Sequence, residues 1–446
     1  MNQDLTKGPI VRTLLFFALP MILGNLLQQL YNVADTPIVG RFLGADALAA
    51  VGSAYTLMTF LTSIFLGLCR GSGAVFSIRY GAGDTERLKS SIFVSFVLIA
   101  GLTAVLNGAV FLLIDPILAF LQVPETVYGL MRDYLWVIFT GICATFLYNY
   151  FASLLRALGN SVAPLLFLAV SALLNIGLDL VFVLAFHWGV KGAAAATVIS
   201  QYVSGLGLCA YTLARFPHLR PERRHCRISR EVLGEISQFS VLTCIQQSVM
   251  NFGILMVQGL VNSFGTAVMA AFAAAVKVDS FAYMPVQDFG NAFSTFIAQN
   301  YGAGKKDRIR RGIRTAGAAA IGFSLAVSAL VFVFARPLMT IFVKAEEAEI
   351  ISIGVGYLRV EGAFYCGIGC LFLLYGFYRA VRKPGMSVVL TVISLGTRVA
   401  LAYLLSAIPA FGVYGIWWSV PIGWFLADAV GILYYWLRRD QLEQAL

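Results

Sequence analysis

The sequence predicts an all-α integral membrane protein of about twelve transmembrane helices, arranged in two pseudo-symmetric lobes of about six helices each. Three observations predict this fold: an apolar composition, apolar stretches of membrane-spanning length along the whole chain, and an internal repeat. Apolar residues make up 59% of the 446 residues, and charged residues only 12%. Because a water-soluble chain normally has about 25% charged residues, this composition favours a protein that lies in lipid.

Long apolar stretches recur from one end of the sequence to the other. A helix needs about 20 mostly apolar residues to cross a hydrocarbon core of about 30 Å. Charge clusters and Gly/Pro breaks divide the sequence into these predicted spans: 13–39, 50–78, 90–114, 132–155, 163–187, 192–214, 235–262, 268–299, 313–335, 354–379, 386–407 and 413–437. The first stretch carries several polar residues and no small-residue cleavage site. We therefore expect a spanning helix there and not a removable signal.

The basic residues predict the orientation of the chain. There are 32 Lys and Arg against 22 Asp and Glu, which gives a net charge of +10. With both termini in the cytoplasm, most of the basic residues face the cytoplasm, as the positive-inside rule requires. We interpret the positive charge as a topology signal. No motif beside these residues indicates a nucleic-acid partner.

A repeated motif divides the chain into two halves. YGAGDTER at Tyr80–Arg87 recurs as YGAGKKDR at Tyr301–Arg308, about 221 residues later. The repeat predicts a first lobe at residues 1–220, a linker at 221–234 and a second lobe at 235–446. An even number of spans per lobe makes both lobes enter the membrane from the same side. Parallel repeats around a central cavity are typical of transporters that alternate between inward-open and outward-open states.

Polar residues in the first span are spaced by three or four positions. A charged side chain at the centre of a membrane helix costs about 2.5 to 3.5 kcal/mol, so a buried ionisable residue is a candidate functional residue. The spacing places these polar residues on one helical face, which we expect to line a cavity. They are Asn25, Gln28, Asn32 and Asp35.

A second polar group falls in the fifth and sixth predicted spans. Asn175 and Asp179 are four residues apart and project from one helical face, and Thr197 lies in the next span. With Asp35 they offer two carboxylates, an amide and a hydroxyl, the hard oxygen ligands that a metal cation accepts. Two nearby carboxylates also favour proton binding. These four residues, called the cation cluster below, predict a site for H⁺ or Na⁺, and we expect no other cofactor.

The second half does not repeat the cation cluster. At offsets of 219 and 221 residues, Asp35 falls on Ile254 and Met256, and at an offset of 223 residues Asp179 falls on Ala402. The cation cluster is therefore predicted in the first lobe only. We interpret four of the remaining charged residues of the later spans as two neutralising pairs. These pairs are Lys277 with Asp279, and Glu361 with Arg398.

Aromatic, methionine and amide side chains in several spans are candidates to line a central cavity. Aromatic faces attract organic cations through stacking and cation–π contact. The expected substrate is therefore a small amphipathic organic cation. The candidate residues are Gln28, Tyr31, Asn32, Gln247, Asn251, Met256, Phe281, Tyr283 and Met284.

Several segments together resemble the multidrug and toxic compound extrusion (MATE) family, in its DinF- and MepA-like prokaryotic type, over essentially the whole chain. They are QQLYNVADTPIVGRFLGADALAAVG in and after the first span, the YGAG turn in each half, and ALLNIGLDLVF in the fifth span. The family's coupling residues match the cation cluster residue by residue. The resemblance also implies a bend of the first helix at Pro20, while Pro37 adds a second break in the same span.

The resemblance implies a secondary active multidrug efflux transporter of the prokaryotic cytoplasmic membrane, which exchanges its substrate for H⁺ or Na⁺ by alternating access. We expect a monomer in contact with the lipid bilayer and with small organic substrates. The alternatives are a lipid-linked oligosaccharide or polysaccharide flippase of a related superfamily, and an intramembrane enzyme. No nucleophile-and-base pair accompanies His187, His218 or His225, and no ATP-binding P-loop occurs. An enzyme is therefore not expected.

Overall fold

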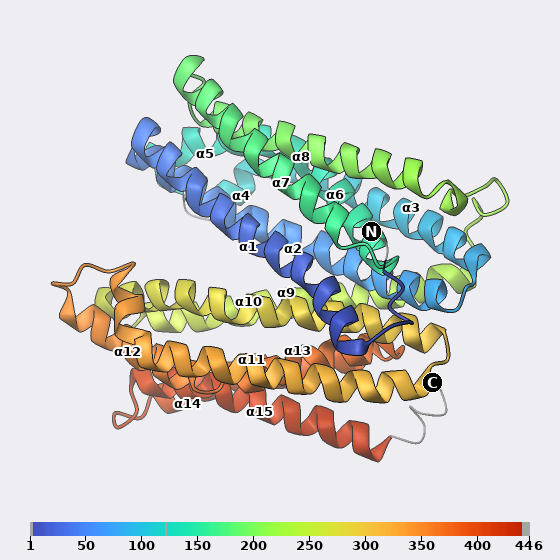
Figure 1. The fold of residues 1–446 in the computed structure, drawn as a ribbon. Helices are drawn as coiled ribbons and strands as arrows, with labels where there is room; N and C mark the ends of the chain where they lie inside the picture. The colour runs from blue at the N-terminus through green and yellow to red at the C-terminus, as the bar shows by residue number, and fades with distance from the viewer. Residues whose placement is uncertain (1–2, 121–122, 439–446) are drawn as a thin grey trace. The chain divides into compact units, whose positions relative to one another are not determined.

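The computed structural model describes residues 3–120 and 123–438, and every regular element in these ranges is a helix (Figure 1). The side chains of residues 29–37, 45, 55, 56, 120 and 255 are not among those described. The helices of the first half are α1 (Ile10–Leu43), α2 (Ala45–Gly81), α3 (Thr85–Leu112), α4 (Ile114–Phe120), α5 (Glu125–Ile138), α6 (Ile142–Ala157), α7 (Val162–Asp179) and α8 (Gly189–Arg215). Those of the second half are α9 (Arg230–Asn262), α10 (Thr266–Gly302), α11 (Lys306–Thr340), α12 (Ala348–Gly362), α13 (Tyr365–Ala380), α14 (Pro384–Ser406) and α15 (Val413–Leu437).

The helices confirm the predicted membrane fold. Within the described residues, 11 helices are long and apolar enough to cross a membrane, and the number rises to 12 if a bent pair counts as one span. This pair is α12 and α13, which meet at an angle of 51° where the sequence predicted one continuous span at 354–379. Another predicted span, 132–155, consists of α5, a short 3-10 turn at Phe139–Gly141 and α6.

The chain forms two compact units, and two long helices contribute to both. The first unit contains Met1–Asp4 and Leu23–Cys244, and the second contains Leu5–Ile22 and Ile245–Leu446. The membership of α1 therefore changes between Ile22 and Leu23, and that of α9 changes between Cys244 and Ile245. These two places are about 222 residues apart, close to the offset of the sequence repeat. The lobe boundaries predicted at residues 220 and 235 follow the repeat and stay a prediction.

Small residues bring α2 and the first part of α9 together inside the first unit. Gly67 and Gly71 are four residues apart on α2, and a Cβ atom on Gly71 would lie 2.6 Å from the Cα of Ser240. On Gly67 it would lie equally close, 2.6 Å, to the Cα of Cys244. The hydroxyls of Ser72 and Ser240 are 2.8 Å apart. Small residues at this spacing let helix backbones approach closely, which is how membrane helices gain packing energy without a hydrophobic effect between them.

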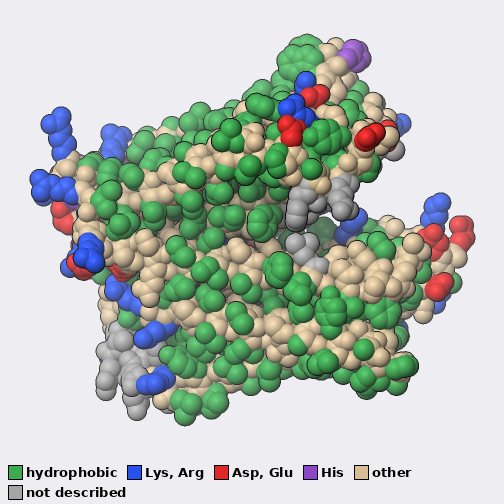
Figure 2. Space-filling model, turned by 180° about the vertical axis from the view of Figure 1, so that it is seen from behind, with side chains coloured by type: hydrophobic (Ala, Val, Ile, Leu, Met, Phe, Trp, Pro, Cys, Tyr) green, Lys and Arg blue, Asp and Glu red, His purple; other side chains and the backbone are tan. Residues whose placement is uncertain are grey.

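The surface is consistent with a lipid environment. Figure 2 shows hydrophobic side chains over the middle of the long helices, with the charged side chains gathered mainly near helix ends and loops. Large apolar side chains are left exposed on many helices; Leu112 is 83% exposed and Leu173 is 73% exposed. In water such a surface would be an aggregation hazard, whereas in a bilayer it contacts acyl chains.

Candidate functional site

Three of the four residues of the cation cluster are described, and all three lie in the first unit. The side-chain amide of Asn175 on α7 donates a hydrogen bond of 3.2 Å to the hydroxyl of Thr197 on α8. That hydroxyl in turn donates to the carbonyl of Ala193 at 3.1 Å. Asn175 and Asp179 are each 1% exposed, one helical turn apart on α7. The structure thus brings an amide, a hydroxyl and a carboxylate of two helices into one buried region.

The chain between α7 and α8 departs from ordinary helix geometry directly after Asp179. The α-helical part of α7 ends at Asp179 and continues as a π-helical turn, Leu180–Ala185. Such turns widen the helix and are frequent at functional sites. Gly189, with a φ of 62°, then begins α8, and a Cβ atom on Gly192 would lie 3.2 Å from the carbonyl of Phe182. This close approach packs the start of α8 against the π-helical turn.

The fourth residue, Asp35, is on α1, and its side chain lies outside the described residues. The same holds for Tyr31, Asn32 and Pro37. Within the described part of the chain, no three His, Cys, Asp or Glu side chains gather as metal ligands would. The joint role of the cation cluster, including Na⁺ binding, therefore stays a prediction, as does the bend at Pro20.

The residues predicted to line a substrate cavity fall in both units. In the first unit, Gln28 is exposed. In the second unit, Gln247 is buried, Asn251 and Met284 are half-buried, and Met256 and Phe281 are exposed. Tyr283 stacks on Phe372 with 6.4 Å between the ring centroids. Their assignment to a common cavity stays a prediction.

A second polar cluster, only partly predicted, is buried in the second unit. The hydroxyl of Tyr365 donates a hydrogen bond of 2.6 Å to Oδ1 of Asp279. The positive charge of Arg398 attracts the carboxylates of both Asp279 and Glu361. The hydroxyl of Tyr357 interacts with the same two carboxylates. The predicted pairing of Asp279 with Lys277 was wrong, because side chains two residues apart on a helix do not face each other. Lys277 instead lies over the ring of Phe342, 5.8 Å from its centroid.

The sequence interpretation missed one buried carboxylate. Asp428 on α15 is 5% exposed, and it acts electrostatically on Cys370 and Tyr375 of α13. The sequence held a usable signal, since Asp428 is the only charged residue in the apolar run from Val413 to Leu437. A full search for acidic residues in the predicted spans would have found it.

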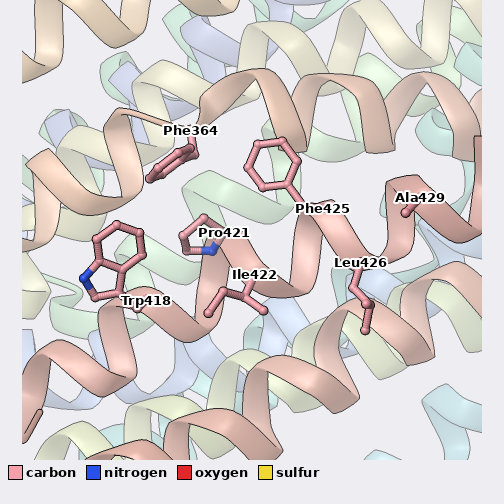
Figure 3. Close-up of a pocket in the computed structure, with 7 residues that line it drawn as sticks. All are labelled: Phe364, Trp418, Pro421, Ile422, Phe425, Leu426 and Ala429. Carbon is pink, nitrogen blue, oxygen red and sulfur yellow. The ribbon is translucent and has the colours of Figure 1, made fainter.

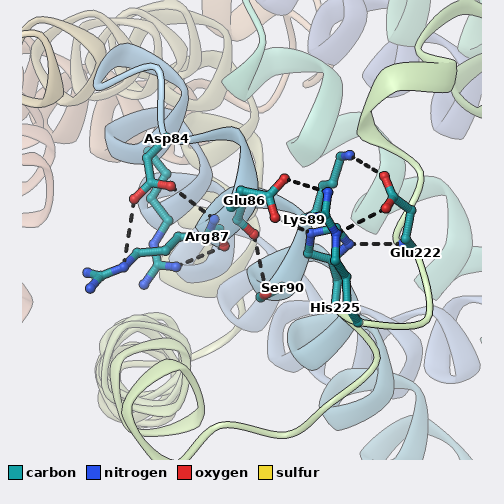
Figure 4. A network of polar contacts seen from close by, with 9 residues as sticks. Asp84, Glu86, Arg87, Lys89, Ser90, Glu222 and His225 are labelled. Atoms are coloured by element: carbon teal, nitrogen blue, oxygen red, sulfur yellow. Dashed lines mark hydrogen bonds and ion pairs between the residues drawn. The ribbon is translucent and has the colours of Figure 1, made fainter.

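A network of charged residues fastens the segment after α8 to the start of α3 within the first unit (Figure 4). Lys89 donates a hydrogen bond of 3.0 Å to Glu222, and this bond holds the pKa of the Glu222 carboxyl below its ordinary value. The backbone N–H of Glu222 donates to Nδ1 of His225. Nε2 of His225 therefore carries the proton and faces Glu86 at 2.8 Å. Arg224 bonds to both Glu222 and Glu86.

An apolar pocket of about 400 Å³ lies beside the proline of α15 (Figure 3). Its lining residues are Phe364, Trp418, Pro421, Ile422, Phe425, Leu426 and Ala429. Specific small-molecule sites combine an apolar lining with a few polar groups that orient the ligand. Apart from the indole N–H of Trp418, the side chains that line this pocket are apolar, and we do not regard it as the functional site.

Comparisons with known proteins place these features in a family. The sequence pattern of the MatE family matches residues 20–181 and 240–404, one match in each half. A relative from Bacillus subtilis, named "Probable multidrug resistance protein YpnP", is 30% identical over 97% of this chain and 96% of its own length. The "FAD transporter" of Shewanella oneidensis is 26% identical over 99% of this chain and 97% of its own length.

Solved structures agree with this assignment. A transporter of the MOP superfamily from Pyrococcus furiosus superposes with a TM-score of 0.91 at 25% identity, covering 98% of each chain. The 11 or 12 apolar spans of the described residues, the internal repeat and the two family matches agree along nearly the full length of the chain. The protein therefore belongs to the MATE (MatE) family of multi-pass membrane transporters.

Proposed function

We propose that this transporter exports amphipathic organic cations in exchange for H⁺ or Na⁺, by alternating access, with the coupling ion bound at the cation cluster of the first unit. The observation that carries the proposal is the 3.2 Å hydrogen bond from Asn175 to Thr197, next to the buried Asp179. A buried carboxylate beside an amide and a hydroxyl is costly for packing alone. The same groups are ligands that a small cation accepts.

The driving force is adequate for efflux. A membrane potential of about 100 mV is worth about 2.3 kcal/mol per charge, and a difference of one pH unit adds about 1.4 kcal/mol. One entering proton thus supplies about 3.7 kcal/mol, enough for a gradient of several hundredfold for an uncharged substrate. Coupling also requires that ion and drug prefer different conformations, because a ligand that binds all conformations equally shifts none of them.

The first helix is the element through which we propose that ion binding acts. Pro20 has no backbone N–H and cannot bond to the carbonyl of Phe16, so the helix is weakened there. The change in unit membership between Ile22 and Leu23 falls just after this proline. Binding of an ion at Asp35 and Asp179 would remove negative charge, alter the helix near Pro20 and weaken drug binding. We further propose a monomer in the prokaryotic cytoplasmic membrane, with both termini in the cytoplasm.

Transport measurements with the purified protein in proteoliposomes test the proposal. Export of a fluorescent organic cation is measured under an imposed pH gradient and, separately, an imposed sodium gradient. Asp179→Asn and Asp35→Asn should each abolish gradient-driven export at normal protein levels, whereas Glu346→Gln, a change to an exposed carboxylate, should not. Export by both aspartate variants at the wild-type rate would refute coupling at the cation cluster. FAD, the cargo in the name of the Shewanella relative, serves as an anionic competitor that tests the preference for cations.

A further inference from the structure

Five polar side chains meet inside the second unit, away from the cation cluster. They come from four helices and are called the second-unit cluster below: Asp279 of α10, Tyr357 and Glu361 of α12, Tyr365 of α13 and Arg398 of α14. Asp279 is 6% exposed, and Glu361 and Tyr365 are each 2% exposed. The function proposed above assigns no role to these residues.

Among the described residues, the hydrogen bonds of this cluster leave two buried atoms without a partner, Oε2 of Glu361 and Nε of Arg398. Asp279 receives the hydroxyl proton of Tyr365 at 2.6 Å, and the hydroxyl of Tyr357 acts on both carboxylates. Oε2 of Glu361 is buried and makes no hydrogen bond. Buried polar atoms are satisfied in the great majority of cases, so an exception indicates a missing ion, water or proton.

The charges of the cluster do not balance. Two carboxylates, Asp279 and Glu361, lie within electrostatic range of a single guanidinium, that of Arg398. The other titratable groups near them among the described residues are the phenols of Tyr357, Tyr365 and Tyr283, which are neutral at physiological pH. With both carboxylates ionised, the cluster would carry one uncompensated negative charge in a membrane-buried site, which is strongly unfavourable.

A proton balances this charge better than a metal cation does. A metal ion here would have to bind beside the guanidinium, which repels it, and would need several oxygen ligands around it. A proton needs one oxygen, and Oε2 of Glu361 is available. Two carboxylates that share a site cannot easily both ionise, and one of them holds a proton.

We propose that the second-unit cluster is a proton-binding site, in which Asp279 and Glu361 together hold one proton and Arg398 sets that number. The proton count follows from the charges: two carboxylates minus one guanidinium. Removing either carboxylate leaves one carboxylate and one guanidinium, whose charges cancel without a bound proton. Removing the guanidinium leaves two carboxylates that hold two protons.

Infrared spectroscopy of the purified full-length transporter tests this count, because a protonated carboxyl and a carboxylate absorb at different frequencies. Titration from mildly acidic to alkaline pH is compared for the wild type and for single variants. Asp279→Asn should remove the protonated-carboxyl signal of Glu361, although Glu361 is still present. Arg398→Leu should add a second protonated carboxyl. The double variant Glu361→Gln/Arg398→Leu should have one protonated carboxyl, now on Asp279. It tests the number of bound protons if Arg398→Leu alone folds poorly.

The controls separate this proposal from its alternatives. Asp428→Asn changes a buried carboxylate outside the cluster and should leave the signal of Glu361 unchanged. If Asp279→Asn keeps the Glu361 signal at wild-type strength, the shared proton does not exist and the proposal is wrong. If saturating NaCl at constant pH removes the wild-type signal, the cluster binds a metal cation and the proposal is equally wrong. These measurements need no transport activity, so they stand or fall independently of the function proposed above.

Discussion

Asn175 of α7 and Thr197 of α8 are joined by a hydrogen bond of 3.2 Å from the amide nitrogen to the hydroxyl oxygen. The bond fixes the amide of Asn175 so that the positions of both of its polar atoms are determined. It also joins the helix that carries Asp179 to its neighbour.

Replacing Thr197 by valine should weaken both stability and ion coupling. Valine has nearly the same shape but no hydroxyl, so the buried amide of Asn175 loses this acceptor at a cost of about 1–3 kcal/mol. A loss of about 1 kcal/mol in ion binding corresponds to about fivefold in the ion concentration for half-maximal export. Ion-driven export in proteoliposomes and thermal unfolding in detergent measure the two effects. Thr197→Ser keeps the hydroxyl and should behave as wild type; equal ion dependence of the valine and serine variants would contradict the assignment.

Replacing Gly71 by alanine should destabilise the first unit. The added methyl group would lie 2.6 Å from the Cα of Ser240, so α2 and α9 must move apart, at a cost of about 1–3 kcal/mol. The melting temperature in detergent should fall. Gly101→Ala is the matched control, because no atom of the described residues lies within 4 Å of a Cβ atom built on Gly101. A similar melting temperature for both variants would show that the contact at Gly71 can relax freely.

Low pH should weaken the network that holds the segment after α8. The hydrogen bond from Lys89 lowers the pKa of Glu222 in the folded protein. A lowered folded-state pKa contributes stability at pH values above the ordinary glutamate pKa of about 4.3, and this contribution is lost as the pH falls through the folded-state pKa. The melting temperature of Glu222→Gln should therefore lie below that of the wild type at neutral pH, and the two should converge in acid. Glu346→Gln, at an exposed glutamate, should parallel the wild type at every pH. A constant difference between Glu222→Gln and wild type would rule out this linkage.

Replacing Arg308 by lysine should loosen the chain before α1. The guanidinium donates hydrogen bonds to the carbonyls of Leu5, Lys7 and Gly8, at 2.6 Å for Gly8. Lysine keeps the charge but has no planar fork to bond several carbonyls at once. Losing about 1.4 kcal/mol of local stability would raise hydrogen exchange of this segment about tenfold, which mass spectrometry can measure. Arg314→Lys, at an exposed arginine, is the control. Unchanged exchange in Arg308→Lys would show that other contacts hold the segment.

The sequence predicted the helices well because lipid imposes a simple requirement. Each span must satisfy its backbone hydrogen bonds internally and expose apolar side chains, so hydrophobic runs identify the helices. The break between α12 and α13 escaped prediction because neither Gly362 nor Phe364 carries an unambiguous helix-ending signal. The exchange of α1 and α9 between units escaped as well, because it depends on tertiary contacts and not on local composition.

Pairing of buried charges was predictable only in part. The electrostatic contact of Glu361 with Arg398 follows from two opposite charges in neighbouring spans. That Asp279 joins them and accepts a hydrogen bond from Tyr365 needs the rotation of α10 and the position of the break before α13. Neither is encoded in residue spacing. The Asn175–Thr197 contact is the counterexample, because two polar residues in consecutive antiparallel spans had few other groups to meet.

The sharing of α1 and α9 means that neither half of the polypeptide is self-sufficient. A fragment ending before Arg230 would lack residues 230–244, and Gly67 and Gly71 of α2 would face lipid without the helix that fits them. A fragment starting there would lack Leu5–Ile22. Expression of either half alone should therefore leave buried helix faces without the segment that covers them.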